Sequence, residues 1–173
     1  MNKLKASIDM QPPEKKCPVR GGLSLILTIV VFQCIGFVIG KLTQGGMSPW
    51  YLTIQKSPLT PPSVVFPIVW SILYCLLAGI GWYLWRNRQQ AVYRKAFMLF
   101  GLQMVMNLLW SPIFFSAHAV GFALAWLILI AAITARLVMV LYLTKRLVAF
   151  LLLPYLLWLL FASYLNAYIW LFN

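Results

Sequence analysis

The sequence predicts an all-α integral membrane protein, a bundle of five transmembrane helices. Of its 173 residues, 63% are hydrophobic and 9% are charged, whereas a soluble domain carries about 25% charged residues. Five apolar runs are each long enough to cross ~30 Å of hydrocarbon as a helix. They show no period-two alternation, so a barrel is not indicated, and an unpaired sheet edge is not stable in lipid.

We expect a flexible polar tail at residues 1–20 and one transmembrane domain at residues 21–173. The first apolar run is longer than the core of a signal peptide, and no Ala-x-Ala site follows it, so it is interpreted as an uncleaved span. A loop at residues 41–61 separates it from the second run and has the composition of a lid. The spans are expected at about residues 21–40, 62–85, 96–115, 119–142 and 147–172.

Prolines shape the expected helices. Pro61 and Pro62 suit the first turn of the second span, where a missing N–H costs nothing. Pro112 and Pro154 lie inside later spans, where a proline kinks the helix and frees a carbonyl. Kinked helices leave a cavity more readily than straight ones, so these prolines favour a site inside the bundle.

Small residues recur at helical spacing in two regions. Gly36 and Gly40 form a GxxxG pattern in the first span, and Ala117, Gly121 and Ala125 lead into the fourth. Such patterns let two helices approach closely. They fit a homodimer face and packing within one chain equally well.

The formal net charge is +12, but the basic residues fall between the apolar runs. The amino-terminal tail and the second and fourth loops are rich in Lys and Arg, whereas the first loop has only Lys41 and Lys56. By the positive-inside rule the amino terminus is cytoplasmic and Asn173 lies on the far side. Nucleic-acid binding is therefore not expected. A bacterial inner membrane is the expected location, with an organelle outer membrane as the alternative.

Asp9 and Glu14 are the only acidic residues, so no carboxylate side chain occurs from Lys15 to Asn173. Ion-coupled carriers usually place Asp or Glu inside the bundle, glycosidases use a carboxylate pair, and hard metal ions need oxygen ligands. The three cysteines lack a metal-binding spacing, and His118 is interpreted as an interfacial residue. We predict no metal site and no conventional catalytic residues.

Polar and aromatic side chains gather in the outer half of the expected bundle. Gln103, Asn107 and Trp110 follow i, i+4, i+7 spacing and share one helix face. A rise of ~1.5 Å per residue puts Trp70 in the same layer. Interhelical hydrogen bonds also explain the amides. For Trp70, Trp110 and Trp158, packing in the core and a position in a pocket wall are equally good explanations. The matching stripe of the fifth span is Tyr155, Trp158, Ala162 and Leu165.

In these motifs the chain resembles the translocator protein family, also called tryptophan-rich sensory proteins or peripheral-type benzodiazepine receptors. The resemblance runs from Gly36 to Asn173 and covers all five spans. Its four blocks are Trp50-Tyr51 with Lys56 and Thr60-Pro61-Pro62; Phe66-Pro67 with Val69-Trp70 and Leu73-Tyr74; Asn107-x-x-Trp110-Ser111-Pro112 with Phe114-Phe115; and Pro154-Tyr155-x-x-Trp158-x-x-Phe161-Ala162-x-x-Leu165-Asn166.

The resemblance implies an outer-half pocket for hydrophobic ligands: porphyrins such as protoporphyrin IX, haem-related tetrapyrroles, sterols, and isoquinoline or benzodiazepine drugs. Indole rings can stack on a flat macrocycle, and Lys56 can pair with a propionate. No cofactor is obligatory, and a porphyrin is the expected ligand. Carried over by motif, the ligand-binding residues are Trp50, Tyr51, Lys56, Trp70, Asn107, Trp110, Trp158, Ala162 and Leu165.

Two positions depart from the family pattern. Leu59 stands where many members have a tryptophan, which removes one stacking contact from the lid. The sterol motif lacks a basic residue after Tyr168, so porphyrin is favoured over sterol.

The leading interpretation is a receptor or sensor that binds porphyrin and regulates tetrapyrrole or stress responses. The alternatives are light-dependent oxidative degradation of porphyrin, with Trp110 and Trp158 as the redox partners, and transport of porphyrin or sterol.

Overall fold

A computed structural model describes residues 18–47 and 50–173. Residues 1–17, most of the expected tail, lie outside the described residues. Within the described ranges the chain forms helices and connecting loops and no strand, which confirms the predicted all-α class. The elements are α2 (Pro18–Met47), α3 (Trp50–Thr53), α4 (Val65–Asn87), α5 (Ala91–Ser111), the π-helix η1 (Pro112–Ser116), α6 (Val120–Thr144) and α7 (Arg146–Phe172).

Five helical stretches are long and apolar enough to cross a membrane, as predicted. Their outward faces carry large exposed apolar side chains, among them Leu42, Ile72 and Leu157. A continuous apolar surface of this kind matches hydrocarbon rather than water. The chain is a multi-pass integral membrane protein. The stretches are Gly21–Thr43, Val65–Asn87, Ala91–Ser116, Val120–Thr144 and Arg146–Phe172.

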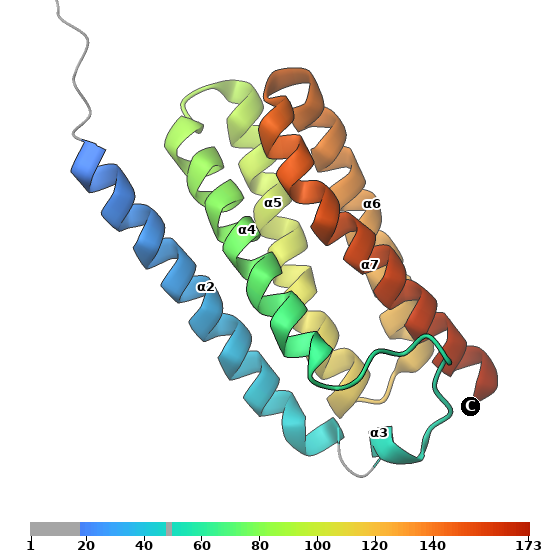
Figure 1. The fold of residues 1–173 in the computed structure, drawn as a ribbon. Coiled ribbons are helices and arrows are strands. Elements are labelled where there is room, and N and C mark those ends of the chain that lie inside the picture. Colours follow the sequence, from blue (N-terminus) through green and yellow to red (C-terminus); the bar gives the residue numbers. More distant parts are fainter. Residues whose placement is uncertain (1–17, 48–49) are drawn as a thin grey trace, which may run out of the picture.

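Four of the long helices form one group, and the fifth lies beside it (Figure 1). α4 and α6 each contact both α5 and α7, while α2 runs along α4. The α4–α5 and α6–α7 connections lie at one end of the group. At the other end lie α3, the connection after η1, and the carboxyl terminus. We call this the lid end.

The core follows the axis of the four-helix group. On α4 the buried side chains Leu73, Leu77, Ile80 and Leu84 are spaced i, i+4, i+7 and i+11, which is one face of a helix. They pack against equally buried residues of α5, α6 and α7. The opposite faces remain apolar because their solvent is lipid.

Prolines place the helix boundaries at the lid end. α4 begins at Val65, three residues after the start expected from Pro62, because the Pro62 carbonyl accepts the Val65 N–H at 2.9 Å and closes a turn first. Pro67 then occupies the first helical turn. At Pro112 the α-helix gives way to η1, and Ala117 N–H donates to the Pro112 carbonyl at 3.0 Å, an i to i+5 bond. Pro154 lies within α7 without ending it.

Small residues are used for packing within the chain. Gly36 lies against the Tyr74 ring, and a Cβ at this position would overlap that ring. Gly121 lies in the same way against the Trp170 indole. Gly40 is the other half of the GxxxG pattern. A Cβ added to it would have no neighbouring atom within 4 Å. The close approach of α2 to α4 therefore depends on Gly36.

Candidate functional site

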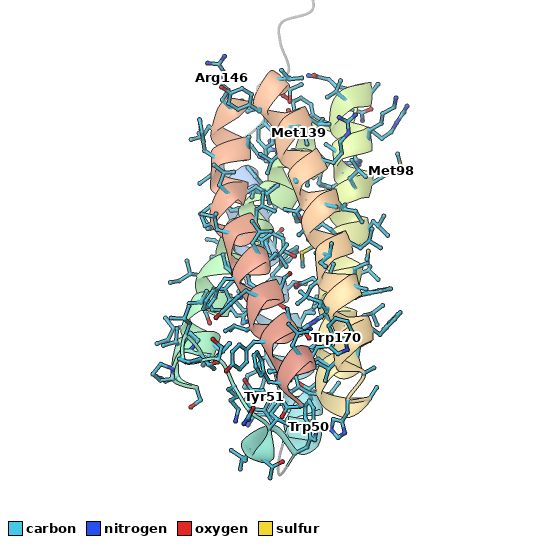
Figure 2. The ribbon with its side chains drawn as sticks, turned by 90° about the vertical axis from the view of Figure 1, so that its right-hand side faces the viewer. Trp50, Tyr51, Met98, Met139, Arg146 and Trp170 are labelled. Atoms are coloured by element: carbon cyan, nitrogen blue, oxygen red, sulfur yellow. The ribbon has the colours of Figure 1, made fainter. Side chains whose placement is uncertain are left out.

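The lid segment, residues 50–60, begins with the short helix α3. Trp50 and Tyr51 lie together at the lid end (Figure 2), with their ring centroids 6.4 Å apart. The Trp50 ring meets Phe114 of η1 edge-on at 5.6 Å, and the Tyr51 ring meets Phe115 at 5.4 Å. The two predicted lid aromatics are thus placed directly on the π-helix that Pro112 creates.

His118 also contacts the lid, which sequence reasoning missed. Its ring stacks on Trp50 with centroids 4.2 Å apart and planes at 23°. Its backbone has φ of 52°, a left-handed conformation that is uncommon for a residue other than glycine. This turn between η1 and α6 directs the histidine towards α3. No sequence pattern signals such a contact between two loops.

Lys56 lies over the Tyr51 ring, with Nζ 4.7 Å from the ring centroid. Burial raises the pKa of the Tyr51 phenol above its ordinary value of 10.0. The phenol is therefore neutral at physiological pH, and Lys56 is the basic side chain of the lid segment. This geometry keeps a cation at the rim of the aromatic cluster.

Hydrogen bonds to α7 and the residue that follows it fasten the other half of the lid segment. Ser57 is buried, and its hydroxyl lies 2.9 Å from the Tyr164 hydroxyl. The Asn173 side chain accepts from Gln55 N–H at 2.8 Å and donates to the Gln55 carbonyl at 3.1 Å. We call these three bonds the lid latch. The sequence did not reveal them, because pairings over more than a hundred residues leave no local signal.

Asn107 and Trp110 lie beneath this cluster on α5. Trp110 stacks on Phe114 at 5.1 Å with planes at 21°, so the lid aromatics and Trp110 share one neighbour. Trp110 Nε1 and Asn107 Nδ2 are both buried, and neither forms a hydrogen bond of good geometry among the described residues, although the Tyr74 hydroxyl lies near the Asn107 amide. Two N–H donors on one helix face are therefore left open in the interior of the bundle.

The remaining predicted residues line the α4–α7 side. Trp70 packs with Tyr74 at 5.4 Å, and Trp158 meets Phe66 at 6.0 Å. Trp70, Trp158 and Ala162 pack against the main core, whereas Trp50 and Tyr51 pack against the smaller cluster at the lid end. Trp110 belongs to both clusters. Leu165 is buried, with 8% of its surface exposed.

A groove of about 340 Å³ crosses the outer wall between α4 and α7. Trp158 is the predicted site residue that lines it. Exposed Ile72 and Leu157 flank it, so the groove faces the hydrocarbon. A smaller hollow of about 130 Å³ lies between α2, α4 and α5 and is lined by apolar side chains and Tyr74.

Metal-ligating side chains do not gather anywhere in the described chain. No group of three His, Cys, Asp or Glu side chains occurs there that could hold a metal ion. Trp110 and Trp158, the predicted photochemical pair, are surrounded by different rings: Phe114 and Phe115 around the first, Phe66 and Phe161 around the second.

Comparison with known proteins identifies the family of this five-helix arrangement. Residues 27–171 match the TspO/MBR family, a range that includes the lid segment and every predicted site residue. The chain belongs to the TspO/MBR family. This finding confirms the resemblance that the four sequence motifs predicted.

Members of the TspO/MBR family with similar sequences occur in animals, archaea and bacteria. Human translocator protein is 36% identical over 137 residues, covering 78% of this chain and 80% of the human protein. Tryptophan-rich protein TspO of Archaeoglobus fulgidus is 34% identical over 153 residues, covering 87% and 97%. Protein CrtK of Rhodobacter capsulatus is 29% identical over 158 residues, covering 87% and 95%.

Proposed function

We propose that this protein is a membrane receptor or sensor that binds porphyrins and other hydrophobic ligands beneath the lid segment. The binding residues are Trp50, Tyr51, Lys56, Trp70, Asn107, Trp110, Trp158, Ala162 and Leu165. Occupancy of the site regulates a tetrapyrrole or stress response.

One observation carries this proposal: Asn107 Nδ2 and Trp110 Nε1 are buried donors that form no hydrogen bond of good geometry within the described residues, directly beneath an aromatic cluster. A buried amide without a partner is costly, and the cost rises in a membrane, where no water replaces the missing bond. A ligand with a polar edge and a flat apolar body supplies what both groups lack. Indole and phenyl rings contribute favourable stacking on such a body.

Charge distribution supports the orientation of the site. The two connections opposite the lid end, with the helix ends beside them, carry Arg86, Arg88, Arg94, Lys95, Lys145 and Arg146, whereas the lid segment carries Lys56. By the positive-inside rule the lid end faces away from the cytoplasm, and the amino terminus is cytoplasmic. A bacterial inner membrane fits this arrangement. Lys56 then meets an acidic group of a ligand that arrives from the outer side.

Equilibrium titration of the detergent-solubilised protein with protoporphyrin IX tests the proposal. We expect saturable quenching of tryptophan fluorescence, weakened at least several-fold by Trp158→Ala and by Trp70→Ala. Trp85→Ala is the matched control, because Trp85 lies at the opposite end of α4 and half its surface is exposed. Absence of saturation in the wild type, or equal losses in all three variants, would contradict the proposal.

A second candidate function is light-dependent oxidative degradation of bound porphyrin. It is favoured by the position of Trp110, whose half-buried ring stacks on Phe114 beneath the lid segment, where the porphyrin is proposed to bind. Illumination in the presence of dioxygen, the oxidant of this reaction, should then convert protoporphyrin IX to a defined oxidised product. The double variant Trp110→Phe with Trp158→Phe should still bind the porphyrin and lose this conversion, whereas unchanged conversion would exclude a role for the two indoles.

A further inference from the structure

The connection between α4 and α5, at the end opposite the lid, holds an arginine on a tryptophan ring. The Arg88 guanidinium carbon lies 3.5 Å from the centroid of the Trp85 ring, and Arg88 Nη1 donates to the Trp85 carbonyl at 2.8 Å. These two contacts hold the side chain at the end of α4 and engage one nitrogen. The remaining N–H groups of a planar guanidinium suit a phosphate.

Arg94 lies across the same connection, in the first turn of α5, and its side chain is exposed. Phe97 follows three residues later, on the same face of the helix, and its ring packs on Trp85 with centroids 5.5 Å apart. Arg88 and Arg94 therefore flank one aromatic pair, the first from α4 and the second from α5. We call Trp85, Arg88, Arg94 and Phe97 the α4–α5 site.

An apolar stripe continues from this site along the outer face of α5. Met98, Leu102 and Val105 follow Arg94 at i+4, i+8 and i+11, and at least half the surface of each is exposed. At ~1.5 Å per residue the stripe reaches about 16 Å from Arg94, roughly half of the ~30 Å hydrocarbon thickness. The α5 stripe thus spans one leaflet, and its cationic end lies at the membrane surface.

The chain brings no anion of its own to this site. No Asp or Glu side chain occurs after Glu14, and the carboxyl terminus lies at the lid end. A second copy of the chain would add arginines to this face and no carboxylate to pair with them. A zwitterionic lipid would add a quaternary amine, but the Trp85 ring that could hold it already carries Arg88. An anionic phospholipid supplies both a phosphate and an acyl chain.

We propose that the α4–α5 site binds an anionic phospholipid. The lipid phosphate contacts the guanidinium groups of Arg88 and Arg94, and one acyl chain lies along the α5 stripe. Trp85 is a positioning residue, because it holds Arg88 in place and does not contact the phosphate. Basic clusters beside transmembrane helices attract anionic lipids in general. Here the stacked arginine and the apolar stripe define one place for the lipid, separate from the proposed porphyrin site.

Native mass spectrometry of the full chain, delipidated in a nonionic detergent, tests the site. The probes are dioleoyl phosphatidylglycerol and dioleoyl phosphatidylcholine, which have the same acyl chains and differ in net charge. We expect one phosphatidylglycerol per chain to bind saturably, at least tenfold more tightly than phosphatidylcholine.

The informative variant is Arg88→Gln combined with Arg94→Gln. It should weaken phosphatidylglycerol binding about 25-fold, since each basic residue near the membrane surface contributes about fivefold, and it should leave phosphatidylcholine binding unchanged. Arg94→Gln alone should give about a fivefold loss. This single variant keeps the bond from Arg88 to the end of α4, so it tests the site even where the double variant does not fold.

Lys145→Gln combined with Arg146→Gln is the matched control. It removes the same charge from the α6–α7 connection at the same end of the bundle. Figure 2 shows Arg146 and Met98 on opposite sides of this end, so the control pair lies away from the α5 stripe. Phosphatidylglycerol binding should fall less than twofold.

Four results would overturn the proposal. Equal wild-type affinities for the two lipids show no preference for an anionic headgroup. Equal losses in the two double variants assign binding to overall charge rather than to the α4–α5 site. Displacement of phosphatidylglycerol by excess glycerol 3-phosphate shows that a free phosphate ester suffices. A double variant that changes the proportion of dimer and not lipid binding assigns this face to a second copy of the chain.

Discussion

Release of the lid latch should open the lid segment and speed the loss of ligand. The double variant Tyr164→Phe with Asn173→Ala removes the three bonds of the lid latch, one to Ser57 and two to the backbone of Gln55. It also removes the bond from Asn173 to the Ile169 carbonyl within the carboxyl-terminal end of the chain, which does not involve the lid segment. A typical hydrogen bond contributes about 0.5–1.5 kcal/mol to stability. The Gln55 pair is exposed and belongs at the low end of that range, whereas Ser57 is buried.

These contributions sum to about 2 kcal/mol for the closed lid, which corresponds to a roughly 30-fold larger population of the open form. Amide hydrogen exchange measures this directly, because exchange of a locally opening segment follows the free energy of opening. The rate for peptides covering the lid segment should rise by about that factor, while the core of α4 keeps its protection. The release rate of bound protoporphyrin IX, followed in a stopped-flow chase, should rise in parallel.

Tyr168→Phe serves as the control, since Tyr168 lies on the same helix and stacks on Phe172. It should leave lid exchange unchanged. A double variant whose lid exchanges as slowly as the wild type would refute the latch. Faster exchange with unchanged porphyrin release would show that ligands leave by another route, such as the groove between α4 and α7.

Two further predictions concern packing and pH. Gly36→Val should lower the stability of the detergent-solubilised protein by about 1–3 kcal/mol, the range for overpacking, because the new side chain overlaps the Tyr74 ring. Gly40→Val, the control, should have little effect. Similar melting temperatures for the two variants would disprove the Gly36 contact. The pKa of the Tyr51 phenol is raised when α3 packs on η1, so the phenol ionises first in the open form. The free energy that favours the packed form is therefore fully present below pH 10.0 and is lost as the pH rises above that value. The difference between ultraviolet titrations of the wild type and Tyr51→Phe should place this phenolate above pH 10.0, and a transition at or below it would contradict the burial of Tyr51.

Much of this architecture follows from hydropathy alone, because in a membrane each helix must satisfy its own backbone and be long enough to cross the hydrocarbon. The spacing of Gln103, Asn107 and Trp110 similarly fixes a shared face, and within the described residues none of its three N–H donors forms a hydrogen bond of good geometry. The start of α4 was harder to predict. A proline is compatible with the first turn of a helix and equally with a turn that precedes the helix, and Pro62 lies in such a preceding turn.

Contacts between loops and distant helices could not be predicted. Ser57 meets Tyr164, and Trp50 meets His118, through the geometry of η1 and the path of the lid segment. Neither pairing has a periodic pattern. Their residue types are common in loops and at membrane interfaces, so composition gives no signal either.

Trp110 is the one predicted site residue that belongs to both packed clusters. A ligand that tilts this indole must also displace Phe114, on which the indole stacks, and Phe114 in turn contacts Trp50. In the proposed sensor, arrival of a ligand inside the bundle would therefore act on the outer surface through three adjoining rings. Such a coupling through side-chain displacement requires no rigid-body movement of the helices, so the surrounding bilayer need not rearrange.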